Sequence, residues 1–519
     1  MTVYRDFVLS VTAQSAAPSW FTALGNNEWA KIGVRAQSAS NPADLSRIAL
    51  PDAGGSFPLF PNGTFDFSGG CIDPTGEQLI VFGGGHSSGI DNGAYAFPLT
   101  QELGTIRWKR WAHTDFPALP QYFSGQSPGW VPWETLRADA NAGTYRIEQH
   151  ATPSDAIDVA GVTRADSSNV QRLASYFRGA NFGTGGPGSS HTYQRFCFAP
   201  DSGGGLTLWQ WGLSDAFNPN AAGGVWNTPL EADLAGPDSY GAECVWKVNP
   251  SRRVSGLSAT GTDYAQSSWA NTAWDLVRTR AEIIGYGGSY RQSGAQPAVY
   301  NPVQGHIVSF GGNLANANVW NHINPSTGAM GQSSRPALAG SYGALTAAPA
   351  SFIKRDGTAD TTHQFAGVLG VTSGVPSFRI IDLSNYANAQ NTIHRTISWP
   401  AGAVYANGSG LVWHAPSQAF IAYGIFDAGI GPYVWKIAPA TPGNWFGANW
   451  TCTKIMLGGS GPTSADVPPG AAPSTGAGAQ IYGRFNILRS FGGGANDALV
   501  YAPHQYGPVY VAKLSTSGI

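Results

Sequence analysis

Short apolar segments that end in glycine recur along this chain. Leu79–Phe82 is followed by Gly83–Gly85 and His86, and Ile307–Phe310 is followed by Gly311–Gly312. Each segment follows a turn with proline or glycine and precedes a second short apolar segment. A strand, a double glycine and a second strand, repeated in this way, predict the blades of a β-propeller. The glycines allow sharp turns and the close approach of neighbouring backbones, which a β-carbon would prevent.

The repeat predicts an all-β fold made of a single propeller. The pattern is found in the windows 64–112, 187–230, 265–300, 298–332, 342–384, 408–437 and 476–513. Two of these windows overlap, so strands there are shared. At about 50 residues per kelch-like blade, the residues outside two exceptional segments suffice for between seven and eight blades. We therefore expect about seven four-stranded blades.

Two segments do not follow the repeat. Residues 1–60 form an N-terminal extension, which is expected either to attach the protein to a partner or to supply the strand that closes the ring. The propeller is expected over 61–519. Within it, the proline-rich segment 113–185 is too long for an ordinary connection, and segments of this length are usually functional. We expect it to cover one face of the ring near His86 and His191.

Composition narrows the partners that the protein can have. Only 12% of the 519 residues are charged and the net charge is −2, so neither nucleic acid nor an anionic membrane surface is expected to bind. The sequence contains no run of about 18 apolar residues, so no membrane-spanning helix is expected. The four cysteines lack the C-x-x-C spacing of a thiolate zinc site, and Cys71 and Cys197 are expected to be buried thiols.

The sequence Tyr-x-Arg-Phe occurs twice, each time directly before an apolar segment. The first copy contains Tyr193 and Arg195, and His191 lies two residues before it. The alternation of these three residues puts them on one face of a strand. If that strand lines the channel, the three side chains form a site for an acidic sugar, in which Arg195 holds a carboxylate and His191 or Tyr193 moves a proton. The alternative is that the arginine is structural and bonds to backbone carbonyls of the neighbouring blade.

The second copy contains Tyr482 and Arg484, for which ligand binding and a structural role are equally consistent with the sequence. His86 follows a glycine turn where a strand emerges, and His113 opens the long insertion, so both are candidate face residues. Trp130 and Trp133 lie in the proline-rich insertion, where indole rings could stack on a sugar. The candidate ligand-binding residues are thus Tyr482, Arg484, His113, Trp130 and Trp133.

Other sites have no motif in the sequence. Serine-hydrolase, zinc-protease, phosphate-binding and EF-hand motifs are absent. We expect no cofactor, and the sequence leaves a bound calcium or zinc ion open.

The stretches Ile72–His86 and Tyr482–Phe485 resemble those of kelch-like, galactose-oxidase-type propellers of bacteria and their viruses. The resemblance implies the propeller fold over roughly 64–513. Within that group, seven-bladed polysaccharide lyases such as ulvan lyases use His, Tyr and Arg for β-elimination at uronic acids. His86, His191, Tyr193 and Arg195 are of matching types, and would be the catalytic residues if the protein is a lyase. The copper-ligand set of galactose oxidase is not found.

Three functions follow as hypotheses. The N-terminus lacks the pattern of a classical signal peptide, and the low charge and high glycine and tryptophan content resemble those of bacteriophage tail or receptor-binding components. The first hypothesis is therefore a propeller that recognises a surface glycan, located outside the cell or on a virion, with the N-terminal arm binding other tail proteins. The second is a polysaccharide lyase, and the third is a structural propeller that binds partner proteins.

Overall fold

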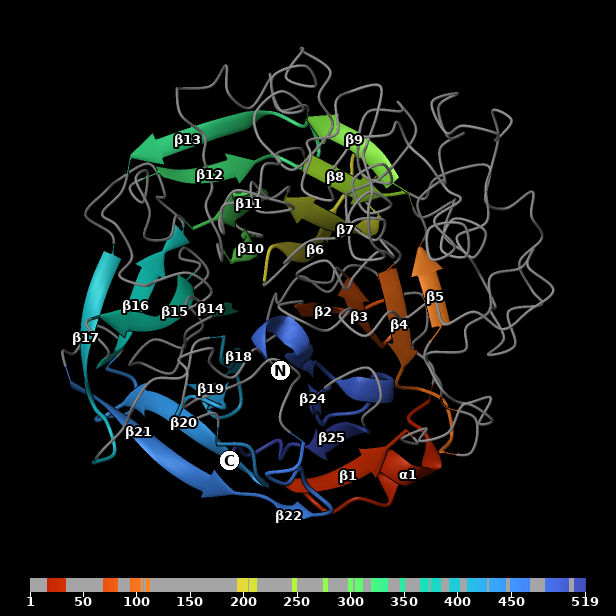
Figure 1. Ribbon diagram of the computed structural model, residues 1–519, viewed down its shortest axis with the longest axis vertical. Helices are drawn as coiled ribbons and strands as arrows, with labels where there is room; N and C mark the ends of the chain where they lie inside the picture. Colours follow the sequence, from red (N-terminus) through yellow and green to blue (C-terminus); the bar gives the residue numbers. More distant parts are fainter. Residues whose placement is uncertain are drawn as a thin grey trace, which may run out of the picture.

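The computed structural model describes 21 stretches of the chain. They are 16–33, 69–82, 94–103, 106, 109–112, 194–203, 205–211, 245–249, 274–278, 297–301, 304–310, 319–334, 346–350, 365–372, 375–383, 392–401, 408–426, 429–444, 449–466, 481–503 and 508–519. These residues form an all-β propeller, as the sequence predicted (Figure 1).

The described strands make six blades of four antiparallel strands, each ordered from the centre of the ring outwards. They are β2 (Gly70–Asp73), β3 (Gln78–Phe82), β4 (Ala94–Pro98) and β5 (Lys109–Ala112); β6 (Phe196–Pro200), β7 (Leu206–Trp211), β8 (Val245–Val248) and β9 (Trp274–Arg278); β10 (Ala298–Asn301), β11 (His306–Ser309), β12 (Val319–Ile323) and β13 (Met330–Ser334); β14 (Thr346–Ala350), β15 (Phe365–Thr372), β16 (Val375–Asp382) and β17 (Thr392–Ser398); β18 (Gly410–His414), β19 (Ala419–Tyr423), β20 (Tyr433–Pro439) and β21 (Asn449–Met456); and β23 (Phe485–Leu488), β24 (Ala498–Tyr501), β25 (Val509–Lys513) and β1 (Glu28–Ile32).

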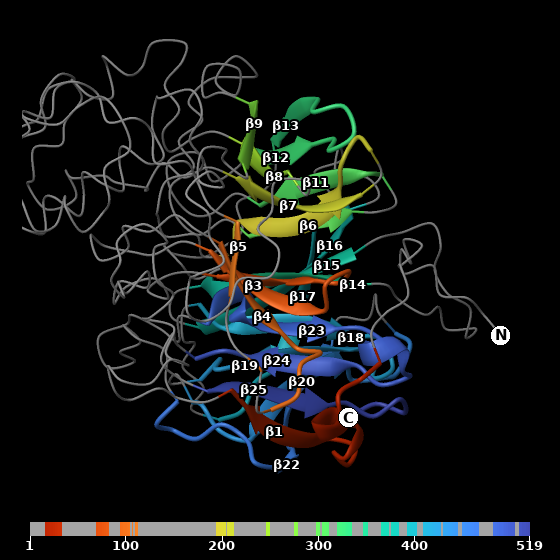
Figure 2. The same cartoon turned by 90° about the vertical axis from the view of Figure 1, so that its right-hand side faces the viewer.

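The innermost strands contact one another in a closed circle, β2 to β6, β10, β14, β18, β23 and back to β2. They surround the centre of the ring in Figure 1. In the view turned by 90°, the ring is seen edge-on and strands of successive blades lie one above another (Figure 2).

The expected number of seven blades is therefore corrected to six in the described residues. The repeat pattern predicts separate blades in the windows 187–230 and 265–300. The structure shows that β9, from the second window, is the outer strand of the blade that begins with β6, and that β10 starts the next blade. Long connections inside one blade separate its strands in the sequence, so a count based on blade length was too high.

The N-terminal strand completes the last blade. β1 pairs antiparallel with β25, with Trp29 opposite Ala512, and pairs parallel with the short strand β22 (Gly458–Gly459). The short helix α1 (Ser19–Thr22) reaches the first blade, where the Ser19 hydroxyl and amide donate to the Glu102 carboxylate at 2.6 and 2.8 Å. Residues 16–33 thus join the last blade to the first, which is the ring-closing alternative.

The turn between the inner two strands is stabilised in the same way in several blades. The Asp73 carboxylate accepts hydrogen bonds from the amides of Thr75 and Gly76, each at 3.0 Å. Asn301 and His414 occupy the same position, five residues before their cross-strand partners. Their side chains bond Gln304 and Ser417, three residues ahead. A polar side chain that satisfies the turn is thus part of the repeat.

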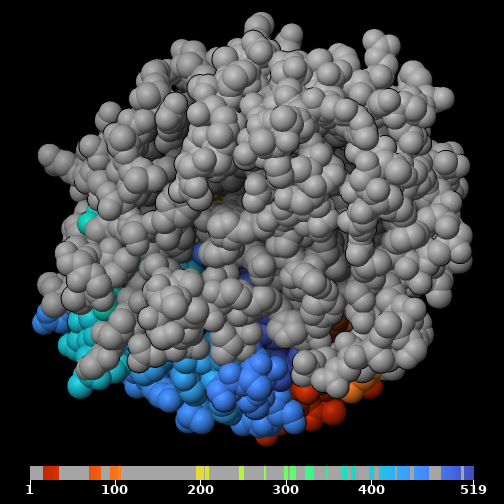
Figure 3. All heavy atoms as spheres, in the orientation of Figure 1, coloured from red at the N-terminus to blue at the C-terminus, as the bar shows by residue number. Residues whose placement is uncertain are grey.

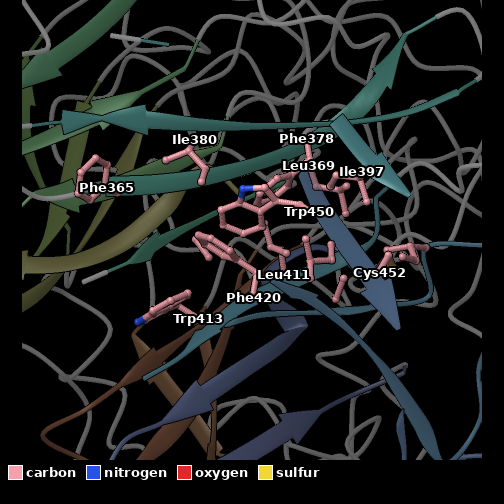
Figure 4. Packing of buried hydrophobic residues seen from close by; sticks show 14 residues of the cluster. Phe365, Leu369, Phe378, Ile380, Ile397, Leu411, Trp413, Phe420, Trp450 and Cys452 are labelled. Carbon is pink, nitrogen blue, oxygen red and sulfur yellow. The ribbon is translucent and has the colours of Figure 1, made fainter. Parts of the chain in front are cut away.

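The fourth and fifth blades share one core. Their outer strands β17 and β21 pair in parallel, which joins the two blades into a single eight-stranded sheet. Trp450 is fully buried in this core, near Phe378 and Phe420, whose ring centroids are 5.6 and 6.4 Å away (Figure 4). Within the described residues, no helix has the length and apolar character needed to cross a membrane.

Candidate functional site

Most of the predicted site residues lie outside the described residues. These are His86, His113, Trp130, Trp133, His191 and Tyr193, together with the insertion 113–185. Their roles stay predictions. Three predicted residues, Arg195, Tyr482 and Arg484, are described, and all three are buried.

Arg195 lies directly before the innermost strand β6 and has no exposed surface. The neighbouring residue, Gln194, connects three blades. Its side-chain amide donates to the Ala347 carbonyl at 2.8 Å and accepts from the Ala347 amide at 2.9 Å, while its backbone carbonyl accepts from Ala298 at 2.9 Å. Gln194 thereby satisfies the inner edge of β14, which would otherwise present unpaired backbone groups.

Arg484 forms hydrogen bonds to backbone carbonyls at the end of β24. Its Nη1 donates to the carbonyls of Pro503 and Ala502, the latter at 3.1 Å. These carbonyls belong to its own blade, whereas the structural alternative had placed them in the neighbouring blade. Tyr482 is 2% exposed, and its amide donates to the Gly408 carbonyl at 2.9 Å, which ties the last blade to the fifth. Ligand binding by Tyr482 and Arg484 stays a prediction.

Two faces of the ring can be distinguished from the turns. Glu77, between β2 and β3, accepts a hydrogen bond from the amide of Gly492, between β23 and β24, at 2.7 Å. The inner turns of adjacent blades therefore lie on one face, which we call the turn face. The opposite ends of the strands define the linker face, where Phe82 pairs with Ala94 and Ala94 with Ala112. The connections that contain His86 and the insertion both leave from these strand ends.

A row of partly exposed aromatic side chains lies at the linker-face ends of the fourth and fifth blades. Trp399, Phe426, Tyr433 and Trp435, with Lys454, form what we call the aromatic edge. Ring centroids are 6.0 Å apart for Trp399 and Phe426, 4.6 Å for Phe426 and Trp435, and 6.2 Å for Tyr433 and Trp435. All three pairs meet edge to face, a preferred arrangement of aromatic rings.

The strand register explains this arrangement. On β20 and β21, Trp435 lies opposite Lys454, and Tyr433 lies opposite Met456. Further along the same face, Ile437 lies opposite Cys452, and both belong to the core shared by the fourth and fifth blades. The aromatic edge is therefore the place where this interior emerges at the surface. In the space-filling view, the described surface of β17 and the C-terminal blades is continuous along the lower part (Figure 3).

The connection beneath Tyr433 is anchored on both sides. The Tyr423 hydroxyl donates to the Gly431 carbonyl at 2.9 Å, and the Leu457 amide donates to the Pro432 carbonyl at 2.9 Å. A β-carbon on Gly431 would lie 2.5 Å from Cε1 of Tyr433, so only glycine lets the ring lie against this loop. Such anchoring fixes the aromatic edge before any ligand arrives.

The aromatic edge does not follow from the repeat pattern, which predicts Val434–Trp435 only as part of the second strand of a blade. The available signal was the alternation in Tyr433–Trp435, which puts both rings on one face beside a buried Val434. Phe426 and Trp399 join them only through the fold, since they come from a loop and from the preceding blade.

The histidine, cysteine and acidic side chains of the described residues are the possible metal ligands, and the cysteines are the possible reactive thiols. Among them, no three His, Cys, Asp or Glu side chains are grouped to hold a metal ion. Cys71 is buried, as expected, and Cys197 is partly buried. Burial raises the pKa of both thiols, to about 12 for Cys197, so both stay protonated at neutral pH.

No protein-family model and no curated protein matches the chain. Among solved structures, a GH43_1 enzyme from Xanthomonas citri aligns with 62% of this chain and 88% of its own, at 11% identity and a TM-score of 0.30. An α-L-arabinanase from Penicillium chrysogenum, complexed with arabinobiose, aligns with 62% of this chain and 96% of its own, at 10% identity and a TM-score of 0.23. At such low scores the similarity is distant, and the function is argued below from this chain's own residues.

Proposed function

We propose that this chain is a carbohydrate-binding propeller, and that the aromatic edge is a contact site for the glycan. The observation that carries the proposal is the row of four partly exposed aromatic side chains, three from an anchored end of the fifth blade and Trp399 from the end of the fourth. Aromatic rings combine a large apolar surface with little conformational freedom, and are therefore favoured in binding sites. Sugar rings present apolar C–H faces that fit against them.

The placement of Arg195 favours binding over β-elimination as the function. A lyase needs its arginine in contact with the substrate carboxylate. Arg195 is the one described residue of the predicted catalytic group, and it is fully buried. Our proposal is accordingly recognition of a polysaccharide, as expected for a component at a cell or virion surface. A tail or receptor-binding role is the setting we propose for it.

Binding can be tested with immobilised and soluble polysaccharides. Wild-type protein is expected to be retained by at least one glycan, and Trp435→Ala is expected to bind it about fivefold to tenfold less tightly, because truncating a central aromatic contact costs more than about 1 kcal/mol. Leu103→Ala is the matched control, since Leu103 is an exposed apolar side chain of the first blade, 46% accessible. It should bind like the wild type.

Two outcomes would contradict the proposal at different levels. If wild-type protein binds none of a broad panel of glycans, carbohydrate recognition is wrong. If it binds a glycan and folded Trp435→Ala binds equally well, the aromatic edge is not the contact site. Rising absorbance of unsaturated uronate during incubation with an acidic polysaccharide would favour the lyase instead.

A further inference from the structure

Lys454 is held over the aromatic edge. Its Nζ lies 3.6 Å from the centroid of the Tyr433 ring and 5.9 Å from that of Trp435. The register places Lys454 directly opposite Trp435, so its aliphatic stem runs along the indole while the ammonium reaches Tyr433. Attraction between the cation and the rings keeps the ammonium in this position.

The charge of Lys454 has no counterpart among the described residues. The ion pairs in which both partners are described involve His414, Arg489 and Asp497, on the turn face. Lys436, the lysine of β20, is engaged elsewhere, since its Nζ donates to the Ile519 carbonyl at 2.7 Å. Lys454 itself is exposed. Its ammonium therefore lies beside apolar rings and in contact with solvent, where an anionic oxygen can approach it.

We propose that the aromatic edge selects an acidic glycan, whose anionic group binds the Lys454 ammonium while its sugar ring lies against the partly exposed aromatic rings. This inference rests on the proposed function and names the ligand class for that site. The shared chemistry is an anionic oxygen group on a sugar, either the carboxylate of a uronic acid or a sulfate. Because the lysine is held by the rings before binding, little of its conformational freedom is lost on contact.

The size of the effect follows from the exposure of the lysine. Ion pairs at solvent-exposed positions contribute little, so removing the charge should weaken binding only about two- to fivefold. The contribution should also fall with salt, because mobile ions screen charges in contact with water. For a neutral glycan with the same backbone, removing the Lys454 charge should leave the affinity unchanged.

The test compares three variants on matched ligands. Lys454→Met keeps the aliphatic stem and removes the charge, and Lys454→Arg keeps the charge. Lys247→Met is the matched control, because Lys247 also lies over an indole, 5.6 Å from the centroid of Trp209, on another blade. Dissociation constants are measured for polygalacturonate, its carboxyl-reduced form and a sulfated galactan, at low and at physiological salt.

We expect Lys454→Met to weaken binding of an acidic ligand two- to fivefold at low salt, with Lys454→Arg and Lys247→Met close to the wild type. Comparing the dissociation constants for polygalacturonate and for the sulfated galactan then shows whether the preferred anionic group is a carboxylate or a sulfate. The inference is overturned if Lys454→Met binds the acidic and reduced ligands as the wild type does, even if its melting temperature is lower, since that result gives Lys454 only a structural role.

The inference and the proposed function fail in distinguishable ways. Equal binding of reduced and acidic ligands, lost in Trp435→Ala, would leave carbohydrate recognition standing and remove the acid selectivity. No binding of any ligand by the wild type would remove both.

Discussion

Gly483 of the last blade and Gly70 of the first blade meet backbone to backbone. A β-carbon on Gly483 would lie 1.8 Å from the carbonyl oxygen of Gly70, which is far too close for two heavy atoms that are not bonded to each other. Gly70 begins β2 and Gly483 lies two residues before β23, so this contact is made where the innermost strands of the two blades meet. The pair marks the junction at which the ring returns to its beginning.

Gly483→Ala should therefore separate the first and last blades. Overpacking of a well-fitted interior costs about 1–3 kcal/mol, and backbone can yield less readily than a side chain. We expect a lower melting temperature and a lower free energy of unfolding in urea. Gly205→Ala is the control, because its β-carbon would lie 3.7 Å from the nearest atom, Oδ1 of Asp201. Equal stability of the two variants would show that the junction is loose.

The N-terminal strand offers a second test of ring closure. Trp29 is 1% exposed and belongs to the core between the fifth and last blades, with its ring 6.4 Å from that of Tyr423. Trp29→Ala should cost about 3–5 kcal/mol, as for other buried tryptophans. Lys31→Ala, at an exposed position of the same strand, should change the free energy of unfolding by less than about 0.5 kcal/mol. Denaturation of both variants in urea measures the difference, and similar losses would argue against closure by packing of β1.

Acid should destabilise the protein through His414. Burial, followed by the positive charges of Arg489 and Lys436, lowers the pKa of this histidine to about 3. Asp497 also faces the ring, with its carboxylate 3.8 Å from Nε2. In the unfolded chain the pKa is about 6.5, so as the pH falls below 6.5 the unfolded state takes up the proton first. Stability from this group is present above pH 6.5 and is lost towards pH 3, by at most about 1.4 kcal/mol per pH unit.

His414→Asn should flatten this acid dependence. Asn301 occupies the same position in the third blade, where it bonds the Leu383 carbonyl at 2.7 Å and the Gln304 amide at 3.3 Å, so asparagine is compatible with the turn. Burial raises the pKa of Glu77, whose contribution to stability is lost as the pH rises, but both proteins retain Glu77. Urea denaturation between pH 7.5 and 4 gives the two slopes. Parallel slopes would contradict the assignment to His414.

The sequence predicted the fold from features that are local. A strand, a turn residue and glycines recur at each blade, and the turn residues Asp73 and Asn301 indeed stabilise the inner hairpins. The number of blades was wrong because β8 and β9 of one blade lie far along the chain from β7, and periodicity does not register pairing across such distances. The ring-closing role of β1 could be stated only as an alternative, since the partner β25 lies at the other end of the sequence.

The site was harder to predict because it depends on burial. Arg195, Tyr482 and Arg484 have residue types that suit a binding site, and sequence does not reveal that all three are enclosed. The aromatic edge combines Trp399, from the end of one blade, with three rings of the next, and only the pairing of β17 with β21 brings them together.

Arg195 allows the ligand-binding and structural interpretations to be separated on one molecule. If Arg195 contacts a carboxylate, as its place in the Tyr-x-Arg-Phe sequence predicts, Arg195→Ala weakens glycan binding roughly tenfold. Because the side chain is fully buried beside β6, we now expect the substitution to act on stability, with a loss of about 1–3 kcal/mol as polar groups around it lose a donor.

The measurement is the melting temperature and the glycan affinity of the same Arg195→Ala preparation, with the affinity corrected for the fraction folded. Arg484→Ala serves for comparison, since Arg484 donates to the carbonyls of Ala502 and Pro503. Its removal should likewise lower the melting temperature and leave the glycan affinity unchanged. Arg195→Lys should recover little stability, because an ammonium lacks the planar set of donors. A tenfold loss of affinity in Arg195→Ala at an unchanged melting temperature would return Arg195 to the binding site, and would make the channel, rather than the aromatic edge, the place where the glycan's acidic group is held.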